Sequence, residues 1–121
     1  MNLDQKGAMN MLKWHLWIDD VREPPNDIYW CWVRTTNEAI KLLKKEIDSG
    51  IEIFDVISLD HDAGDFAWDG GDYIKILDWL EENYPDCPHI FHIHSMNCVG
   101  RQNMVRIIYH NDWSYLQEEL K

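Results

Sequence analysis

Short hydrophobic runs alternate with longer amphipathic segments along most of the chain. The runs at 14–19, 29–35, 54–60 and 89–95 are rich in aromatic and β-branched residues. Runs of this length and composition, bounded by polar residues, predict four β-strands. The run at 54–60 is almost continuously apolar, which is typical of a parallel strand that is covered on both faces.

Two segments between these runs have hydrophobic residues at helical spacing. Residues 36–49 and 72–84 each place their apolar side chains on one helical face, which predicts a helix in both. Thr35 and Glu38 form a capping box at the start of the first helix, and Gly50 marks its end.

The C-terminal third and the first connection are less regular. Residues 97–110 begin as a helix, but 105–110 fit either the same helix or a fifth strand. Residues 112–120 predict a short closing helix. Pro24 and Pro25 forbid a regular helix between the first two strands, so we expect a loop there.

Alternating strands and helices predict an α/β fold in which helices pack on a mostly parallel sheet of four or five strands. At 121 residues the chain is expected to form one domain. We assign residues 1–12 to a loosely ordered lead-in and 13–121 to that domain. The polar lead-in leaves open whether Met1, Met9 or Met11 is the natural start.

The formal net charge of −11 changes which partners are expected. General nucleic-acid binders and proteins of anionic membranes need surplus Lys and Arg, so we expect neither role. Clustered acids suit divalent cations instead. The three cysteines lack metal-type spacing, so we expect no disulfide framework. No apolar run has the length of a membrane span and no signal sequence is evident, which favours a cytoplasmic protein.

Acidic, imidazole and hydroxyl side chains gather at three predicted strand ends. Carboxyl ends of parallel strands share one edge of the sheet, where ligands bind. The residues at these ends are Asp19 and Asp20 (first strand), Asp60, His61 and Asp62 (third strand), and His92, His94, Ser95 and Asn97 (fourth strand). Asp60 and Asp62 share a direction if the third strand persists through them.

Carboxylates packed together repel one another and raise each other's pKa unless a cation intervenes. A divalent metal is the simplest such cation, and carboxylate oxygens favour Mg²⁺ or Mn²⁺. Added imidazole shifts the preference toward Mn²⁺, Fe²⁺ or Zn²⁺. Arg22 or Arg101 can bind a phosphate bidentately, and the free backbone amides near Asn97 also favour an anion.

Each of these residues also has a structural interpretation. An aspartate pair at a strand end is often a turn or a helix cap, and Arg101 can be a solvated helix charge. His61 between two acids can be in an ion pair, and His92 is explained more readily as a core histidine than as a ligand. The coincidence at three strand ends is what favours a functional site.

Four segments in this order resemble a known family. They are LWIDD (16–20), ISLDHD (57–62), DGGDYI (69–74) and HSMNCVGRQNM (94–104). The pattern resembles the response-regulator receiver fold, and more closely its cyclic-phosphate processing receiver branch, over residues 14–108.

The resemblance implies a compact receiver-like (flavodoxin-like) fold, arranged as a three-layer sandwich. It implies a Mg²⁺ site formed by Asp20 and Asp60, with Asp19 close by. Asp60 matches the phospho-accepting aspartate of receivers, and Ser95 matches the hydroxyl residue after their fourth strand.

Two departures argue against ordinary phosphorelay signalling. Receivers have a lysine after the fifth strand, but this chain has none between Lys75 and Lys121. They also have a helix between the first two strands, where this chain has a loop. The additional residues that match the cyclic-phosphate branch are His61, Asp62, His94, Asn97 and Arg101.

The sequence therefore favours a metal-dependent phosphoesterase that processes a cyclic or terminal phosphate. The expected partner is a phosphate-bearing small molecule or an RNA end, such as a 2′,3′-cyclic phosphate or a cyclic nucleotide. The candidate residues are Asp60, His61, His94 and Ser95 for catalysis, Arg101, Asn97 and Arg22 for phosphate binding, and Asp19, Asp20, Asp60 and Asp62 for the metal.

Two alternatives stay open. The chain can be a non-enzymatic receiver or binding module that takes up phosphate on Asp60 or binds a nucleotide. It can also be an interaction protein that retains a receiver scaffold with an inactive site.

Overall fold

The computed structural model describes residues 13–25 and 29–117. These residues include one sheet of five parallel strands. The strands are β1 (Trp14–Ile18), β2 (Trp30–Val33), β3 (Phe54–Leu59), β4 (Ile90–Ile93) and β5 (Ser114–Tyr115). Their order in the sheet is β2-β1-β3-β4-β5, which is the flavodoxin-like order. The predicted α/β receiver-like fold is confirmed.

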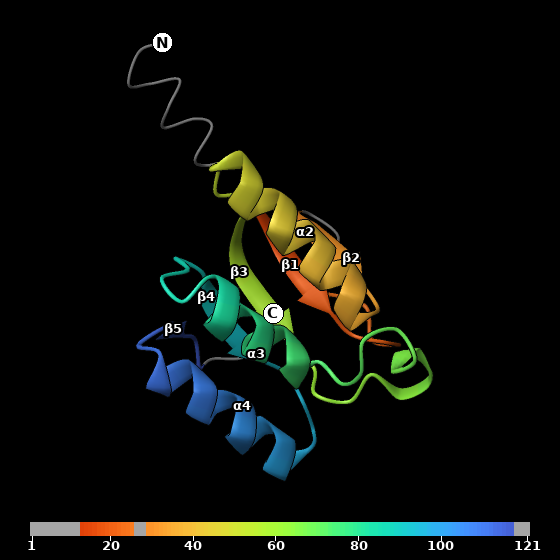
Figure 1. Cartoon of the computed structure of the whole chain (residues 1–121). Helices are drawn as coiled ribbons and strands as arrows, with labels where there is room; N and C mark the ends of the chain where they lie inside the picture. Colours follow the sequence, from red (N-terminus) through yellow and green to blue (C-terminus); the bar gives the residue numbers. More distant parts are fainter. Residues whose placement is uncertain (1–12, 26–28, 118–121) are drawn as a thin grey trace.

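The described helices cover one face of the sheet. They are α2 (Thr36–Ser49), α3 (Ile74–Asn83) and α4 (Cys98–His110), and a short 3-10 turn, η1, spans Gly64–Phe66. Each helix connects two strands, and in all three connections the chain moves across the sheet in the direction from β2 to β5. Because such crossovers are right-handed, all three helices lie on the same face, as Figure 1 shows. Among the described residues no helix covers the other face, so they form two layers and do not include the third layer of the expected sandwich.

The loop expected between the first two strands is confirmed where it is described, because residues 19–25 and 29 contain no helix. Trp17 of β1 fixes this loop against the second face of the sheet. Its indole Nε1 donates a hydrogen bond of 2.7 Å to the backbone oxygen of Arg22, and its side chain is buried. Pro24 and Pro25 lie in the described part of the loop.

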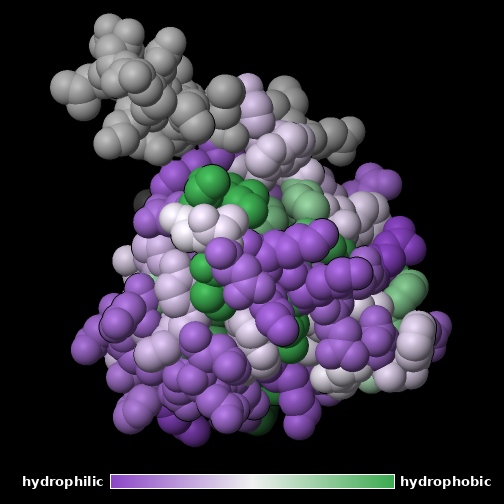
Figure 2. Space-filling model, turned by 45° about the horizontal axis from the view of Figure 1, so that its top comes forward, coloured by the Kyte–Doolittle hydropathy of each residue, from purple (hydrophilic) through white to green (hydrophobic). Residues whose placement is uncertain are grey.

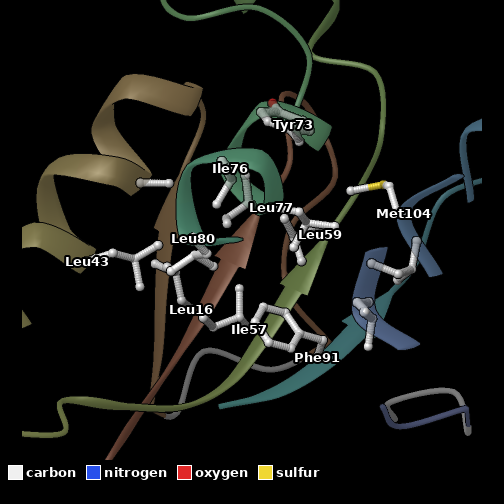
Figure 3. Packing of buried hydrophobic residues seen from close by; sticks show 14 of the residues in the cluster. Leu16, Leu43, Ile57, Leu59, Tyr73, Ile76, Leu77, Leu80, Phe91 and Met104 are labelled. Atoms are coloured by element: carbon white, nitrogen blue, oxygen red, sulfur yellow. The ribbon is translucent and has the colours of Figure 1, made fainter. Parts of the chain in front are cut away.

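The hydrophobic core fills the space between the sheet and its helical layer. Figure 3 shows the side chains that point into it from both sides. They are Leu16 of β1, Ile57 and Leu59 of β3, Phe91 of β4, Leu43 of α2, Ile76, Leu77 and Leu80 of α3, and Met104 of α4, all fully buried. This core holds β1, β3 and β4 in place, and their carboxyl ends carry the candidate residues.

The structure resolves the two uncertain assignments near the C-terminus. Residues 98–110 are one continuous helix, so the alternative of a strand at 105–110 is wrong. The expected closing helix is wrong for residues 112–117, where β5 pairs with β4. Asp112 has φ 57°, outside the helical region, and the buried Trp113 donates a hydrogen bond of 2.7 Å to the Pro85 oxygen. The rest of that segment, 118–120, and the lead-in 1–12 lie outside the described residues.

The ends of α2 follow the sequence prediction. The Thr35 hydroxyl accepts a hydrogen bond of 3.0 Å from the backbone N–H of Glu38. Gly50 adopts φ 69°, the left-handed conformation that ends many helices at glycine.

A buried carboxylate ties α2 to the sheet at the opposite end from the candidate site. One oxygen of Glu46 accepts hydrogen bonds from the backbone N–H groups of Ile53 (2.7 Å) and Phe54 (2.8 Å). Its other oxygen lies 2.6 Å from Nε2 of the buried His89, just before β4. The Glu46 pKa is lowered: burial alone raises it, but the hydrogen bonds from His89, Phe54 and Ile53 outweigh burial.

The outer surface agrees with the acidic composition. The face of the molecule seen in Figure 2 is mostly hydrophilic, and its hydrophobic residues form small separate patches. None of the described helices has both the length and the apolar character that crossing a membrane requires.

Candidate metal and phosphate site

Three carboxylates meet where β1 and β3 end side by side. Asp19 and Asp20 follow β1, and Asp60 follows β3. The backbone N–H of Asp60 donates a 2.9 Å hydrogen bond to the Ile18 oxygen, which extends the strand pairing to this point. One ligand oxygen from each of the three carboxylates lies within 4.8 Å of the other two. We call Asp19, Asp20 and Asp60 the central cluster.

Asp19 is buried and held as a carboxylate by its partners. One of its oxygens accepts hydrogen bonds from the backbone N–H groups of Val21 (3.0 Å) and Arg22 (2.8 Å), and the other lies 2.9 Å from His94 Nε2. Burial raises the Asp19 pKa, but the hydrogen bonds from His94 and the two amides outweigh it and lower the pKa to about 2. Asp19 therefore carries its charge at neutral pH.

The pKa of Asp20 is shifted upward, opposite to that of Asp19. Burial and the neighbouring carboxylates of Asp19 and Asp60 raise its pKa. The chain at Gly64, where φ is 55°, passes so close that a Cβ built there would lie 2.5 Å from an Asp20 oxygen. Burial contributes most to the raised pKa of Asp20, and the like charges held beside it add to the rise.

The central cluster fits a divalent cation. Its donors are carboxylate oxygens, which Mg²⁺ and Mn²⁺ prefer. A cation among them would also relieve the repulsion that raises the Asp20 pKa.

His94 is fixed beside the central cluster by its ring and by both of its nitrogens. Its imidazole stacks on the Trp17 indole, with ring centroids 3.8 Å apart and planes 1° apart. Nε2 lies 2.9 Å from Asp19, and Nδ1 lies 2.8 Å from the hydroxyl of the fully buried Ser58. The same hydroxyl lies 2.7 Å from His92 Nδ1.

The partners set the direction of these hydrogen bonds. A carboxylate only accepts, so the proton between His94 and Asp19 is on Nε2. In neutral His94, Nδ1 then accepts from the Ser58 hydroxyl, and the Ser58 oxygen accepts from His92 Nδ1. A serine that the sequence shows only as a polar residue in an apolar strand thus positions the imidazole.

A second group of possible metal ligands comes from the segment between β3 and α3. His61, Asp62 and Asp72 each offer a ligand atom, and these atoms lie within 4.8 Å of one another. His61 Nδ1 is 2.7 Å from an Asp62 oxygen. The Asn97 amide nitrogen lies 3.3 and 3.4 Å from the two Asp62 oxygens. We call His61, Asp62 and Asp72 the second cluster.

Asp62 was predicted as a metal ligand together with Asp19, Asp20 and Asp60. It lies in the second cluster, whereas the other three form the central cluster. β3 ends at Leu59, so strand alternation does not extend to Asp62. Asp72 was not among the predicted site residues, although it lies in the DGGD segment. Gly70 (φ 109°) and Gly71 (φ 86°) turn the chain back so that Asp72 accepts a 3.0 Å hydrogen bond from the Ala63 N–H.

The first turn of α4 lies against the second cluster. The Asn97 side-chain oxygen caps the helix by accepting a 2.9 Å hydrogen bond from the Gly100 N–H. A Cβ at Gly100 would lie 2.5 Å from two carbon atoms of the His61 ring. Only glycine leaves room there for the imidazole. Ser95 is buried, and its hydroxyl accepts a 3.0 Å hydrogen bond from the Asn97 N–H.

The two predicted phosphate-binding arginines lie at a cavity next to His94. Both Arg22 and Arg101 line a cavity of about 330 Å³, together with His94 and Ser95. Neither guanidinium forms an ion pair with a carboxylate of the described residues.

Comparison with known protein families decides the assignment. The model of the cyclic-phosphate processing receiver domain matches residues 14–110. The chain belongs to this family. Comparison with curated proteins and with solved structures gave no match.

The family assignment confirms the resemblance found in the sequence, and the geometry adds how its motifs are used. In this cyclic-phosphate processing receiver domain, LWIDD and ISLDHD build the central cluster, and ISLDHD and DGGDYI build the second. Asn97 of the HSMN segment contacts the second cluster through Asp62. The roles of individual residues stay predictions.

Ser58→Ala tests how His94 is oriented. The substitution removes the donor to His94 Nδ1, while Asp19 still holds the proton on Nε2. We therefore expect the Nδ1 resonance to shift, the tautomer to stay the same, and the protein to lose about 1–3 kcal/mol of stability. The ¹⁵N chemical shift of His94 Nδ1 reports the loss of this hydrogen bond. Thr36→Val, which removes another buried hydroxyl bonded to the Gly71 oxygen, is the matched control. Unchanged His94 shifts in Ser58→Ala would contradict this assignment.

Proposed function

We propose that this chain is a metal-dependent phosphoesterase that hydrolyses a cyclic or terminal phosphate. The central cluster carries the proposal. Three carboxylates from two strand ends converge within 4.8 Å, and an imidazole lies 2.9 Å from one of them. The family name, which refers to cyclic-phosphate processing, supports the substrate class.

Asp19, Asp20 and Asp60 would hold the cation, Mg²⁺ or Mn²⁺. A bound divalent cation polarises phosphoryl oxygens and offsets the charge that develops on them. Backbone hydrogen bonds hold two of these ligands in place, because Asp19 accepts two N–H bonds and Asp60 accepts one from His61. Holding the ligands in advance lowers the cost of assembling the site around the phosphate.

Opening a 2′,3′-cyclic phosphate requires two proton transfers. A water oxygen attacks phosphorus and gives up a proton, while one P–O bond to the ribose breaks and the released oxygen takes a proton. His61 belongs to the second cluster, and its Nε2 makes no hydrogen bond to a described residue, so it would carry one of these protons. Both ring nitrogens of His94 are bonded, to Asp19 and Ser58, so His94 would take part only by exchanging a proton with one of these partners. Ser95 and Asn97 follow His94 in the chain and would contact the phosphate.

Asp60 could instead attack the phosphorus directly and form an aspartyl-phosphate. The same residue is the phosphoacceptor if the chain is a binding or signalling module. The described lysines do not favour the module, because none of them hydrogen bonds or pairs with the central cluster.

Substrate turnover measured by ³¹P NMR distinguishes these possibilities. The substrates are an RNA oligonucleotide ending in a 2′,3′-cyclic phosphate, several cyclic nucleotides and an aryl phosphate, each with Mg²⁺, Mn²⁺ or chelator. The proposal predicts conversion of a cyclic phosphate to a monoester only with metal. No conversion of any substrate, combined with labelling of Asp60 by acetyl phosphate, would favour the module instead.

Gly100→Ala tests the part of His61 in this reaction. The added methyl group must displace the imidazole, because it would lie 2.5 Å from the ring. A displacement of about 1 Å can lower a rate about 100-fold. The helix itself should not be weakened, because alanine favours a helix over glycine by about 1 kcal/mol. We expect kcat to fall by about 10–100-fold. Gln102→Ala, on an exposed position of α4, is the control. Full activity of Gly100→Ala would exclude His61 from the reaction.

A further inference from the structure

The cavity beside His94 has features of a binding site of its own. Its volume is about 330 Å³, which lies at the lower end of the range for small-molecule sites. It is lined by residues of the β1–β2 loop, by the end of β4 and by the start of α4. Its lining includes Met96, a residue that is 83% exposed.

The charges that line the cavity differ from those of the whole chain. The chain has 22 acidic and 11 basic residues. The described lining nevertheless contains two guanidiniums, Arg22 and Arg101, against one carboxylate, Glu23. The imidazoles of His92 and His94 also line it. The cavity therefore favours an anion, although the protein as a whole repels anions.

Both guanidiniums have donors left for a ligand. Arg22 Nη1 donates a 3.1 Å hydrogen bond to the backbone oxygen of His94, and this bond directs the side chain to the cavity without neutralising it. Arg101 is half-buried, and its guanidinium forms no hydrogen bond or ion pair with any described residue. A guanidinium has five donors and binds phosphate in a bidentate manner.

The cavity is next to the central cluster but separate from it. His94 lies between the two, because its Nε2 is 2.9 Å from Asp19 and the residue also lines the cavity. Neither Arg22 nor Arg101 has its guanidinium bonded to the carboxylates of the central cluster. A ligand that reaches around His94 would thus place one anionic group at each position.

We infer that this cavity is a subsite for a second phosphate of the substrate, next to the phosphate that reacts. The inference rests on the proposed function for the position of the reacting group. The preferred substrate then carries two phosphates, and Arg22 and Arg101 bind the one that does not react. The second phosphate can belong to the next nucleotide of an RNA end or to a second phosphoryl group on a mononucleotide.

Binding without metal tests the subsite independently of turnover. Calorimetry in chelator would compare adenosine 3′,5′-bisphosphate, pyrophosphate and AMP as probes. We expect Arg101→Gln to weaken binding of the doubly phosphorylated probes by about 10–100-fold, as the loss of a charge-assisted hydrogen bond does. Arg106→Gln, on the same helix but outside this cavity, is the matched control. No binding by the wild type, or equal weakening by both variants, would overturn the subsite.

Turnover of matched substrates identifies the source of the second phosphate. A dinucleotide and a nucleoside, each ending in a 2′,3′-cyclic phosphate, are compared with a 5′-phosphorylated nucleoside 2′,3′-cyclic phosphate. We expect at least a 10-fold higher kcat/KM for a substrate with two phosphates, and loss of this preference in Arg101→Gln. Arg22→Lys should retain part of it. Equal kcat/KM for all three substrates would overturn the inference but leave the proposed function intact. Probe binding without any turnover would support the subsite and refute the proposed function.

Discussion

Asp60→Asn should abolish hydrolysis almost completely. The substitution keeps the size of the side chain but removes the charge that Asp60 contributes to the central cluster, and with it a ligand for the cation. Metal assistance is worth several kcal/mol of transition-state stabilisation, and each 1.36 kcal/mol is tenfold in rate. We therefore expect kcat/KM to fall by about 1,000-fold, measured with the best substrate at saturating metal.

Asp65→Asn is the matched control for this variant. Asp65 is an exposed carboxylate in η1, belongs to neither cluster, and undergoes the same change in charge. It should retain full activity. If Asp60→Asn were as active as Asp65→Asn, neither attack by Asp60 nor a cation held by it could be part of the reaction.

Glu46→Ala should cause the largest loss of stability. It removes the acceptor of two backbone N–H groups, Ile53 and Phe54, and leaves His89 buried without its partner. Breaking a buried pair of this kind costs about 3–5 kcal/mol. Denaturant unfolding measures the change. Asp48→Ala, at an exposed position of α2, should change stability by less than about 0.5 kcal/mol. A loss for Glu46→Ala as small as this control would contradict the assignment.

The contribution of Glu46 should also depend on pH. Its pKa is lower in the folded protein than its ordinary value of 4.5, since hydrogen bonds from His89 and two amides outweigh the effect of burial. The unfolded state then binds a proton more readily, so the stabilisation is fully present above pH 4.5 and is lost as the pH falls through the lowered pKa. Comparison of wild type and Glu46→Gln from pH 7 to pH 3 should show the stability difference narrowing toward acid. A constant difference would argue against this assignment.

The central cluster could be predicted from the sequence because its geometry follows from strand order alone. Asp19 and Asp20 follow one buried apolar run and Asp60 follows another, and carboxyl ends of parallel strands share an edge. Nothing beyond the strand assignments is needed. The helix at 36–49 could be predicted for a similar reason, since its capping box and its terminal glycine are local signals.

The second cluster could not be predicted because it depends on turns. Asp62 leaves the direction of β3 when the strand ends at Leu59, and two glycines with positive φ bring Asp72 back to it. Hydrophobic periodicity contains no information on such turns. The position of β5 likewise depends on a contact between residues far apart in the sequence, the hydrogen bond from Trp113 to the Pro85 oxygen. A local sequence pattern does not predict such a contact.

The environment of His94 could be predicted only in part. Its position at the end of the fourth predicted strand indicated a site residue, but its orientation depends on Trp17 and Ser58, which lie on other strands. Arg22 and Arg101 line one cavity, and their assignment to phosphate binding stays a prediction. That this cavity is separate from the central cluster required the three-dimensional structure.

The most direct test of the account is hydrolysis of a 2′,3′-cyclic phosphate by metal-free protein during titration with Mn²⁺. We predict no turnover in chelator, activity that rises to saturation with added Mn²⁺, and loss of this response in Asp20→Asn but not in Asp65→Asn. Turnover that continues undiminished in chelator, or a Mn²⁺ response that Asp20→Asn leaves unchanged, would contradict a catalytic metal at the central cluster.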